Sequence, residues 1–327
     1  MTYILSFIVA FGVAAIAGQI LIPLLRRLKA GQSIREDGPT WHMAKQGTPT
    51  MGGIMFILAI GVAALTAGWE DLLLGSRNHL YVFLFALVFG IIGFIDDFQK
   101  LRHHANEGLT AGQKFLLQLA AAIAFTVLLR GSGYLTPNLY IPFLNVELAL
   151  PWVVYMVFAA FVMVGTVNAV NITDGIDGLA SGVTMPVMLF FTAVAALWDR
   201  GELGVFSAAL LGGLAAFLLY NFHPAKVFMG DTGSLFLGGA VCGLAFGLDI
   251  PLVLILVGVI YIAETLSDII QVAYFKATHG KRIFRMAPLH HHLEMGGWSE
   301  VKLVCVFTMI TLAACLLAFF GVLDRWT

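Results

Sequence analysis

Residues 79–97 read HLYVFLFALVFGIIGFIDD, an apolar run that ends in two adjacent carboxylates. A helix needs ~20 mostly apolar residues to cross a bilayer, and this run is of that length. No Lys, Arg, Asp or Glu interrupts it before Asp96. The stretch therefore predicts a membrane-spanning helix that places Asp96 and Asp97 at the boundary between lipid and water.

The composition of the whole chain also indicates that lipid surrounds much of the protein. Hydrophobic residues fill 60% of the 327 positions, charged residues fill 11%, and the mean hydropathy is +0.91. Soluble domains carry roughly 25% charged residues, so this chain has too few polar side chains to cover a water-facing surface. The net charge of −1 argues against nucleic acid as a partner. The three cysteines lie in apolar runs and predict neither a disulfide nor a metal site.

Other apolar runs of similar length follow the same pattern. We expect ten spans, at 3–25, 50–69, 79–97, 112–130, 151–170, 178–198, 204–221, 233–248, 252–272 and 302–323. The sequence thus predicts an all-α polytopic membrane protein, with residues 1–327 forming one integral membrane domain. Between 131 and 150, the segments that begin at Tyr140 and Val146 predict a small hairpin.

Lys and Arg predict the orientation, because cytoplasmic loops carry an excess of both. Fourteen of the eighteen lie in or beside the loops at 26–51, 98–112, 171–177, 222–232 and 273–301. The other loops hold the remaining four. We therefore expect the first set of loops in the cytoplasm, and both termini and the hairpin outside.

Asp96 and Asp97 are the first candidates for chemistry. Two adjacent carboxylates at a helix end suit a divalent cation or a general base, and the simpler alternative is a pair of solvated acids. Ionisable groups at membrane depth are usually functional, which favours the first interpretation. The sequence does not distinguish the roles of the two acids.

Asn168, Asn171, Asp174 and Asp177 recur every three residues where the fifth predicted span ends. On a helix, this spacing keeps neighbours in the row close together. Two amides and two carboxylates at one helix end can bind a nucleobase, a ribose or a metal. A plain polar helix cap is the alternative.

A third group surrounds GDTGS at 230–234, which precedes an apolar helix. Backbone N–H groups at such a helix start favour an anion. Asp231 beside an anion needs a cation, which points to Mg²⁺ bridging carboxylate and phosphate oxygens. Asn221 and Phe228 lie just before the motif, where Phe228 can stack on a base or pack at the interface. An N-cap made by Asp231 or Thr232 is the simpler alternative.

His290, His291 and His292 follow one another in the last cytoplasmic loop. Consecutive side chains diverge and seldom bind one ion, so contacts with phosphate and sugar oxygens are favoured over a transition-metal site. Lys45 and Lys114 add positive charge, although solvated lysines in cytoplasmic loops are the alternative. Together these groups predict phosphate chemistry, with a nucleotide diphosphate arriving from water and an amphiphile arriving from lipid.

Several motifs resemble a known family. GFIDD at 93–97, NAVNITDGIDGL at 168–179 and FMGDTGS at 228–234 resemble the polyprenyl-phosphate N-acetylhexosamine-1-phosphate transferase superfamily. REDGP at 35–39, KQGTPTMGG at 45–53 and IFRMAPLHHH at 283–292 are closer to its phospho-N-acetylmuramoyl-pentapeptide transferase branch. The resemblance covers nearly the whole chain, and the motifs follow the order of the family.

The resemblance implies a reaction in which undecaprenyl phosphate attacks the sugar-linked phosphate of UDP-N-acetylmuramoyl-pentapeptide, releasing UMP and leaving lipid I. It implies Mg²⁺ on Asp231, with Asp96 and Asp97 as the other catalytic residues. It also implies a site that faces the cytoplasm from the bacterial inner membrane. The substrate-binding positions that it implies are Lys45, Lys114, Asn168, Asn171, Asp174, Asp177, Asn221, Phe228, Gln271, His290, His291 and His292.

Two alternatives are a sister enzyme that transfers N-acetylglucosamine-1-phosphate to the same lipid, and a nucleotide-sugar transporter. Transporters place polar groups near the bilayer midplane, whereas most of these acids gather at one end of the spans. The sequence leaves open a homodimer, the identity of the base within the Asp96–Asp97 pair, and whether transfer takes one step or two.

Overall fold

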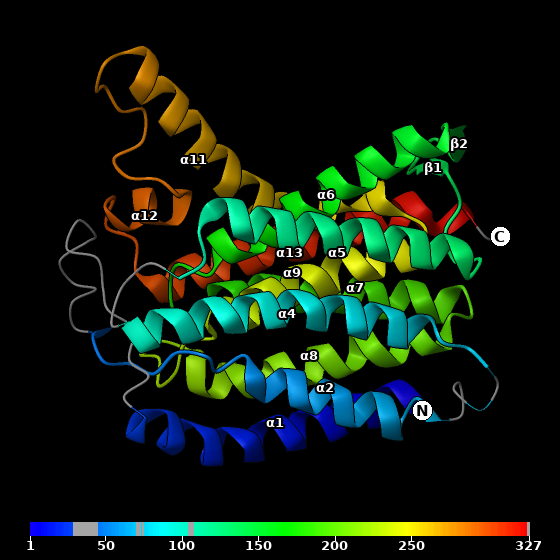
Figure 1. Ribbon diagram of the computed structural model, residues 1–327, viewed down its shortest axis with the longest axis horizontal. Coiled ribbons are helices and arrows are strands. Elements are labelled where there is room, and N and C mark those ends of the chain that lie inside the picture. Colours follow the sequence, from blue (N-terminus) through cyan, green and yellow to red (C-terminus); the bar gives the residue numbers. More distant parts are fainter. Residues whose placement is uncertain (29–44, 70–72, 74, 104–107, 326–327) are drawn as a thin grey trace.

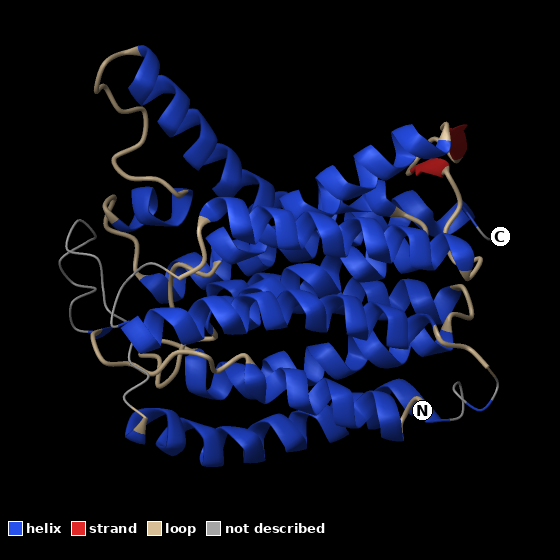
Figure 2. Ribbon diagram, viewed as in Figure 1, coloured by secondary structure: helices blue, strands red, loops and turns tan. Residues whose placement is uncertain are grey.

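The computed structural model describes residues 1–28, 45–69, 73, 75–103 and 108–325, and in these it is almost entirely helical (Figures 1 and 2). Its elements, in chain order, are α1 (Thr2–Arg27), α2 (Ile54–Thr66), α4 (Asn78–His103), α5 (Ala111–Gly131), β1 (Asn138–Ile141), β2 (Val146–Ala149), α6 (Trp152–Thr173), α7 (Leu179–Leu197), α8 (Gly201–Asn221), α9 (Gly230–Gly247), η2 (Pro251–Val253), α10 (Leu254–Val257), α11 (Val259–Ala277), α12 (Leu289–Glu294), α13 (Glu300–Val322) and η3 (Leu323–Arg325).

The prediction of an all-α polytopic membrane protein is confirmed. Seven helices in the described part of the chain are long and apolar enough to cross a membrane, and a bent pair makes an eighth if it is one span. The helix within the predicted span at 50–69 is shorter than expected, since α2 has 13 residues. The predicted hairpin is also present, with β1 antiparallel to β2 and Tyr140 opposite Glu147.

The predicted span at 252–272 is not a single straight helix. The helical segment 251–257 and α11 meet at an angle of 79°. Gly258 stands between them, and its N–H donates to the carbonyl of Leu254, which ends α10. Hydropathy gives no sign of this break, because the residues next to Gly258 are apolar on both sides. As a result α11 leaves the bundle at a steep angle (Figure 1).

The core of the bundle is α9, which is buried continuously from Thr232 to Gly247. It packs between α4 and α6, and glycines permit the close approach. A Cβ at Gly238 would lie 2.5 Å from Cα of Val167 in α6, and one at Gly93 of α4 would overlap the carbonyl oxygen of Asp231. Small residues at helix contacts are a common basis of association in membranes.

The polar groups gather at one end of this bundle. The chain passes from α4 to α5 and from α6 to α7 at the end where α12 lies, and α9 and α13 also begin there, whereas the hairpin lies at the opposite end (Figure 1). The contact of Gly93 with the start of α9 therefore sets the distance between two elements that carry candidate catalytic residues.

We expect Gly93→Ala to lower the thermal midpoint of the protein in detergent. The added methyl group must push α4 away from the first turn of α9, and overpacking of this kind destabilises by about 1–3 kcal/mol. Gly165→Ala is the control, because a Cβ at that position on α6 meets nothing within 4 Å. Equal midpoints for the two variants would contradict the close packing of α4 on α9.

Candidate active site

Three carboxylates meet where α4 ends and α9 begins. Asp96 and Asp97 lie near the end of α4 and are 2% and 4% exposed, while Asp231 is the second residue of α9. One oxygen from each side chain lies within 4.8 Å of the others. The structure thus brings together the three residues that the sequence suggested for metal binding or catalysis. We call Asp96, Asp97 and Asp231 the acidic cluster.

Asp97 joins α4 to the N-terminus of α9. Its Oδ1 accepts the backbone N–H of Asp231 at 3.1 Å. Its Oδ2 accepts the backbone N–H of Thr232 at 2.9 Å and the Thr232 hydroxyl at 2.7 Å. An anion at a helix N-terminus satisfies N–H groups that have no partner within the helix. Asp97 therefore has a structural role as well as a place in the acidic cluster.

Two ammonium groups neutralise much of the charge of the cluster. Lys114 Nζ lies 2.6 Å from Asp231 Oδ2, and Lys100 Nζ lies 2.6 Å from Asp96 Oδ2 and 3.0 Å from Asp231 Oδ2. Lys114 was predicted as a site residue, but Lys100 was not. Its spacing of four residues from Asp96 on one helix was the available signal.

The amides of α6 contribute unequally to this site. Asn171 Nδ2 lies 2.9 Å from Oδ1 of Asp231 and 2.7 Å from Oγ of Ser234, so it orients the carboxylate. Asn168 lies one turn earlier and its Nδ2 donates to Gln118 Oε1 at 2.7 Å. Residues spaced three apart on a helix point in slightly different directions around its axis. This difference explains why Asn171 contacts Asp231 and Asn168 does not.

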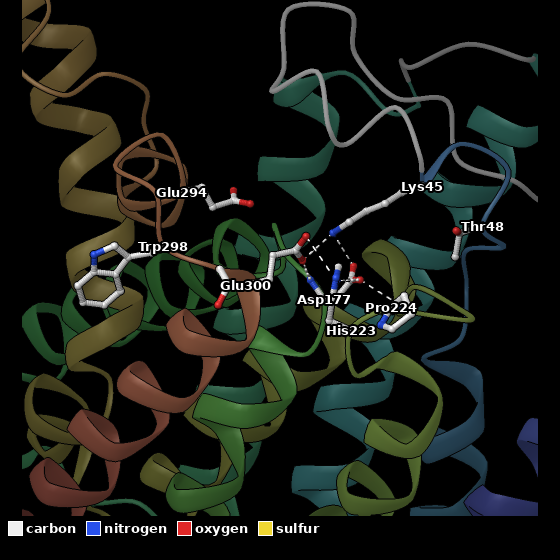
Figure 3. Close-up of a pocket in the computed structure, with 10 residues that line it drawn as sticks. Lys45, Thr48, Asp177, His223, Pro224, Glu294, Trp298 and Glu300 are labelled. Carbon is white, nitrogen blue, oxygen red and sulfur yellow. Dashed lines mark hydrogen bonds and ion pairs between the residues drawn. The ribbon is translucent and has the colours of Figure 1, made fainter.

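A second polar group lies beside a pocket of about 540 Å³ (Figure 3). Lys45 Nζ bridges Asp177 Oδ1 at 2.7 Å and Glu300 Oε2 at 2.6 Å. His223 Nδ1 lies 2.9 Å from Asp177 Oδ2. Lys45 and Asp177 were predicted; Glu300 and His223 were not, and Glu300 lies 255 residues from Lys45 along the chain. We call Lys45, Asp177, His223 and Glu300 the pocket cluster, and its three acidic and imidazole side chains are a second group that could hold a metal.

Asp174 lies between the two clusters. Withdrawal from water raises the pKa of its carboxyl well above the ordinary value, and the negative charges of Asp231, Asp97 and Asp177 raise it further. The segment that carries Asp174 also joins the two clusters, because Asn171 contacts Asp231 of the acidic cluster and Asp177 belongs to the pocket cluster.

Asn221 and Phe228 hold the loops around the pocket. The buried amide of Asn221 accepts the N–H of Gly178 and donates to the carbonyl of Val227, each at 3.0 Å. The backbone of Phe228 pairs with Pro49 and Gly52, each at 2.8 Å, which joins the segment after Lys45 to the loop before α9. Both residues thus have backbone contacts that fix the shape of the site.

Gln271 and the three histidines have different surroundings. Gln271 Oε1 accepts the N–H groups of Ile283 and Phe284, so it anchors the loop that leads to α12. His290 contacts Glu264, His291 contacts Glu294, and His292 accepts the N–H of Arg285. Each ring has a separate partner, as expected of consecutive side chains that do not share one metal. The REDGP motif at 35–39 lies outside the described residues.

Oxygen donors, ammonium groups and a pocket on one continuous surface suit a substrate with several phosphate oxygens. Carboxylates can hold a hard divalent cation. Lysine ammonium groups can bind phosphate oxygens that enter beside that cation. The arrangement can therefore bind and polarise a diphosphate.

Known proteins resemble this chain along nearly all of its length. A family model described as glycosyl transferase family 4 matches residues 79–249, and the phospho-N-acetylmuramoyl-pentapeptide-transferase signature 1 matches residues 45–57. The chain is 48% identical over 322 residues to the phospho-N-acetylmuramoyl-pentapeptide-transferase of Clostridium acetobutylicum, covering 98% of this chain and 99% of the relative. The enzyme of the same name from Acetivibrio thermocellus is 47% identical, with 98% and 95% covered.

We expect Asp97→Asn to lower the thermal midpoint more than Asp96→Asn does. The NH₂ group of the new amide would face one of the backbone N–H donors at the start of α9 and could not accept its hydrogen bond. An unsatisfied buried donor destabilises by about 1–3 kcal/mol. Asp96 accepts only the N–H of Leu109 from the backbone, at 2.8 Å. Thermal unfolding in detergent measures both variants, and a smaller shift for Asp97→Asn would contradict its structural role.

Proposed function

The chain belongs to the phospho-N-acetylmuramoyl-pentapeptide-transferase family, within glycosyl transferase family 4, and we propose that its reaction takes place at the acidic cluster and the adjoining pocket. The protein transfers phospho-N-acetylmuramoyl-pentapeptide and forms lipid I in peptidoglycan synthesis. Its substrates are accordingly UDP-N-acetylmuramoyl-pentapeptide from the cytoplasm and undecaprenyl phosphate from the bilayer. We treat the whole chain as one transferase domain.

The continuity of the two clusters is the observation that carries this proposal. A nucleotide sugar is long, and its transferred phosphate must lie beside a metal while its nucleoside is held elsewhere. Asn171 contacts Asp231 and lies six residues before Asp177 at the end of α6, so one extended ligand can reach both clusters. The nucleoside would lie at the pocket cluster with Asn221 and Phe228, and the diphosphate at the acidic cluster.

Mg²⁺ fits the acidic cluster by the chemistry of its donors. The three side chains offer only carboxylate oxygens, which Mg²⁺ prefers. Two ammonium groups contact these oxygens, which is direct evidence that the cluster attracts positive charge. Asp231 would hold the ion. When bound, Mg²⁺ neutralises diphosphate oxygens and stabilises UMP as a leaving group.

Asp96 is the better candidate for the proton acceptor. Both carboxyl oxygens of Asp97 accept hydrogen bonds from the start of α9, whereas Asp96 has one oxygen that contacts only ammonium groups. The second pKa of a phosphate is about 6, so the lipid phosphate is largely deprotonated at neutral pH and needs little general-base catalysis. Lys100 and Lys114 would bind the phosphate oxygens and bring the two negative substrates together.

The distribution of basic residues supports a cytoplasmic site in the bacterial inner membrane. Fourteen of eighteen Lys and Arg residues lie in or beside the loops expected in the cytoplasm, and the residues of both clusters lie in or beside the same loops. The hairpin would then lie on the periplasmic side. A water-soluble nucleotide sugar could reach the pocket from this side, while the lipid arrives within the membrane.

Purified protein with undecaprenyl phosphate and Mg²⁺ should release UMP from UDP-N-acetylmuramoyl-pentapeptide and not from UDP-N-acetylglucosamine. The reason is the basic loop around α12, which suits a substrate that carries peptide carboxylates as well as phosphates. His291→Ala and His292→Ala should impair this turnover. Efficient UMP release from UDP-N-acetylglucosamine by the wild type would favour the sister activity, and binding without release would favour a transporter.

We expect activity to be lost in excess EDTA and restored by Mg²⁺ or Mn²⁺, but poorly by Ca²⁺, which prefers longer distances and more ligands. Asp231→Asn and Asp96→Asn should each lower kcat at least about 10²-fold, because charge stabilisation at the reacting phosphate is lost. UMP release measures both effects, and thermal unfolding checks the fold. Full turnover in excess chelator would remove the metal from the mechanism.

A further inference from the structure

A buried pair of ionisable side chains, Glu264 and His290, lies outside both clusters. Neither side chain has exposed surface. His290 Nδ1 lies 3.0 Å from Glu264 Oε2, and the backbone N–H of His290 donates to the same oxygen at 3.3 Å. The pair joins α11 to α12, and Glu264 has no part in the proposed function so far.

The contact with Glu264 determines which ring nitrogen is free. A carboxylate has no donor to offer, so Nδ1 of His290 carries a hydrogen and donates it. The other nitrogen, Nε2, is buried and has no hydrogen-bond partner among the described residues. It lies against Gly175, where an added Cβ would overlap it. The free nitrogen therefore faces the turn that carries Asp174 and Asp177.

An unsatisfied ring nitrogen in the interior is unfavourable. If the pair served only to join α11 to α12, leaving Nε2 of His290 unpaired beside a polar site would add nothing to its stability. Here the atom lies against Gly175, in the turn that runs from Asp174 to Asp177, and the residues on either side of this turn contact both clusters, where a bound nucleotide sugar would place its phosphate oxygens. A ligand can supply the partner that the protein lacks.

We propose that Glu264 is a positioning residue of the transfer reaction, which holds His290 so that Nε2 bonds a phosphate oxygen of the nucleotide sugar. This inference rests on the proposed function. In the doubly protonated ring, Nε2–H donates to an anionic oxygen and the Glu264 carboxylate pairs with the positive charge. Carboxylates that orient a histidine in this way are needed for full activity in other sites.

Glu264→Gln keeps an acceptor oxygen and nearly the same volume but removes the charge. We expect kcat for UMP release to fall about 10–100-fold, with a smaller change in KM. Glu264→Asp should recover part of the loss, because it restores the carboxylate. In the His290→Ala background, Glu264→Gln should cause no further loss, since Glu264 acts only through His290. Asp199→Asn, an exposed acid at the opposite end of α7, is the control for loss of charge.

A variant that displaces the His290 ring sterically tests the proposal independently of Glu264. Gly175→Ala must displace the His290 ring, so it should lower kcat in the wild type and have a smaller effect in His290→Ala, where the ring is absent. Thermal midpoints of all variants distinguish a loss of folding from a displacement of the His290 ring. This comparison does not depend on how well Glu264→Gln folds.

The outcomes are distinguishable. An inactive wild type would overturn the proposed function and this inference with it. If the wild type is active and Glu264→Gln is equally active, the inference alone is overturned. The same holds if Glu264→Gln lowers kcat by the same factor in the wild type and in His290→Ala. A loss that depends on His290, partly recovered by Glu264→Asp, supports it.

Discussion

The bond between the Asp97 carboxylate and the first N–H groups of α9 is the contact on which the rest of the site depends. It joins the end of α4 to the start of the most deeply buried helix, and it places Asp231 beside Asp96. The absence of a side chain at Gly93 permits the approach. The same carboxylate thus stabilises the core of the fold and brings the acidic cluster together.

Both clusters obey one electrostatic rule, which is that a buried carboxylate needs a cation. Lys100 lies between Asp96 and Asp231, and Lys45 lies between Asp177 and Glu300. Buried charges are tolerated when they are paired in this way. Substrate phosphates would offer the lysines the same negative charge that the acids offer now, and at the acidic cluster a bound Mg²⁺ would then compensate the carboxylates.

The sequence predicted the helical fold and the meeting of Asp96, Asp97 and Asp231, because each lies at the polar end of an apolar run. It did not predict the break at Gly258, since the residues next to it are apolar on both sides. Glu300 was missed as a site residue because its partner, Lys45, is distant in sequence, and a local pattern carries no information on such contacts. Gln271 and Asn221 were predicted to bind substrate, and they hydrogen-bond loop backbone.

The burial of α9 on all sides has a consequence for biogenesis. This helix is not among the seven that are long and apolar enough to cross a membrane unaided, and its first turn carries Asp231. A segment of that kind gains little from partitioning into lipid alone. Its buried faces pack against α4 and α6, which emerge earlier from the ribosome. The helices that enclose this central segment are therefore already synthesised when it leaves the ribosome.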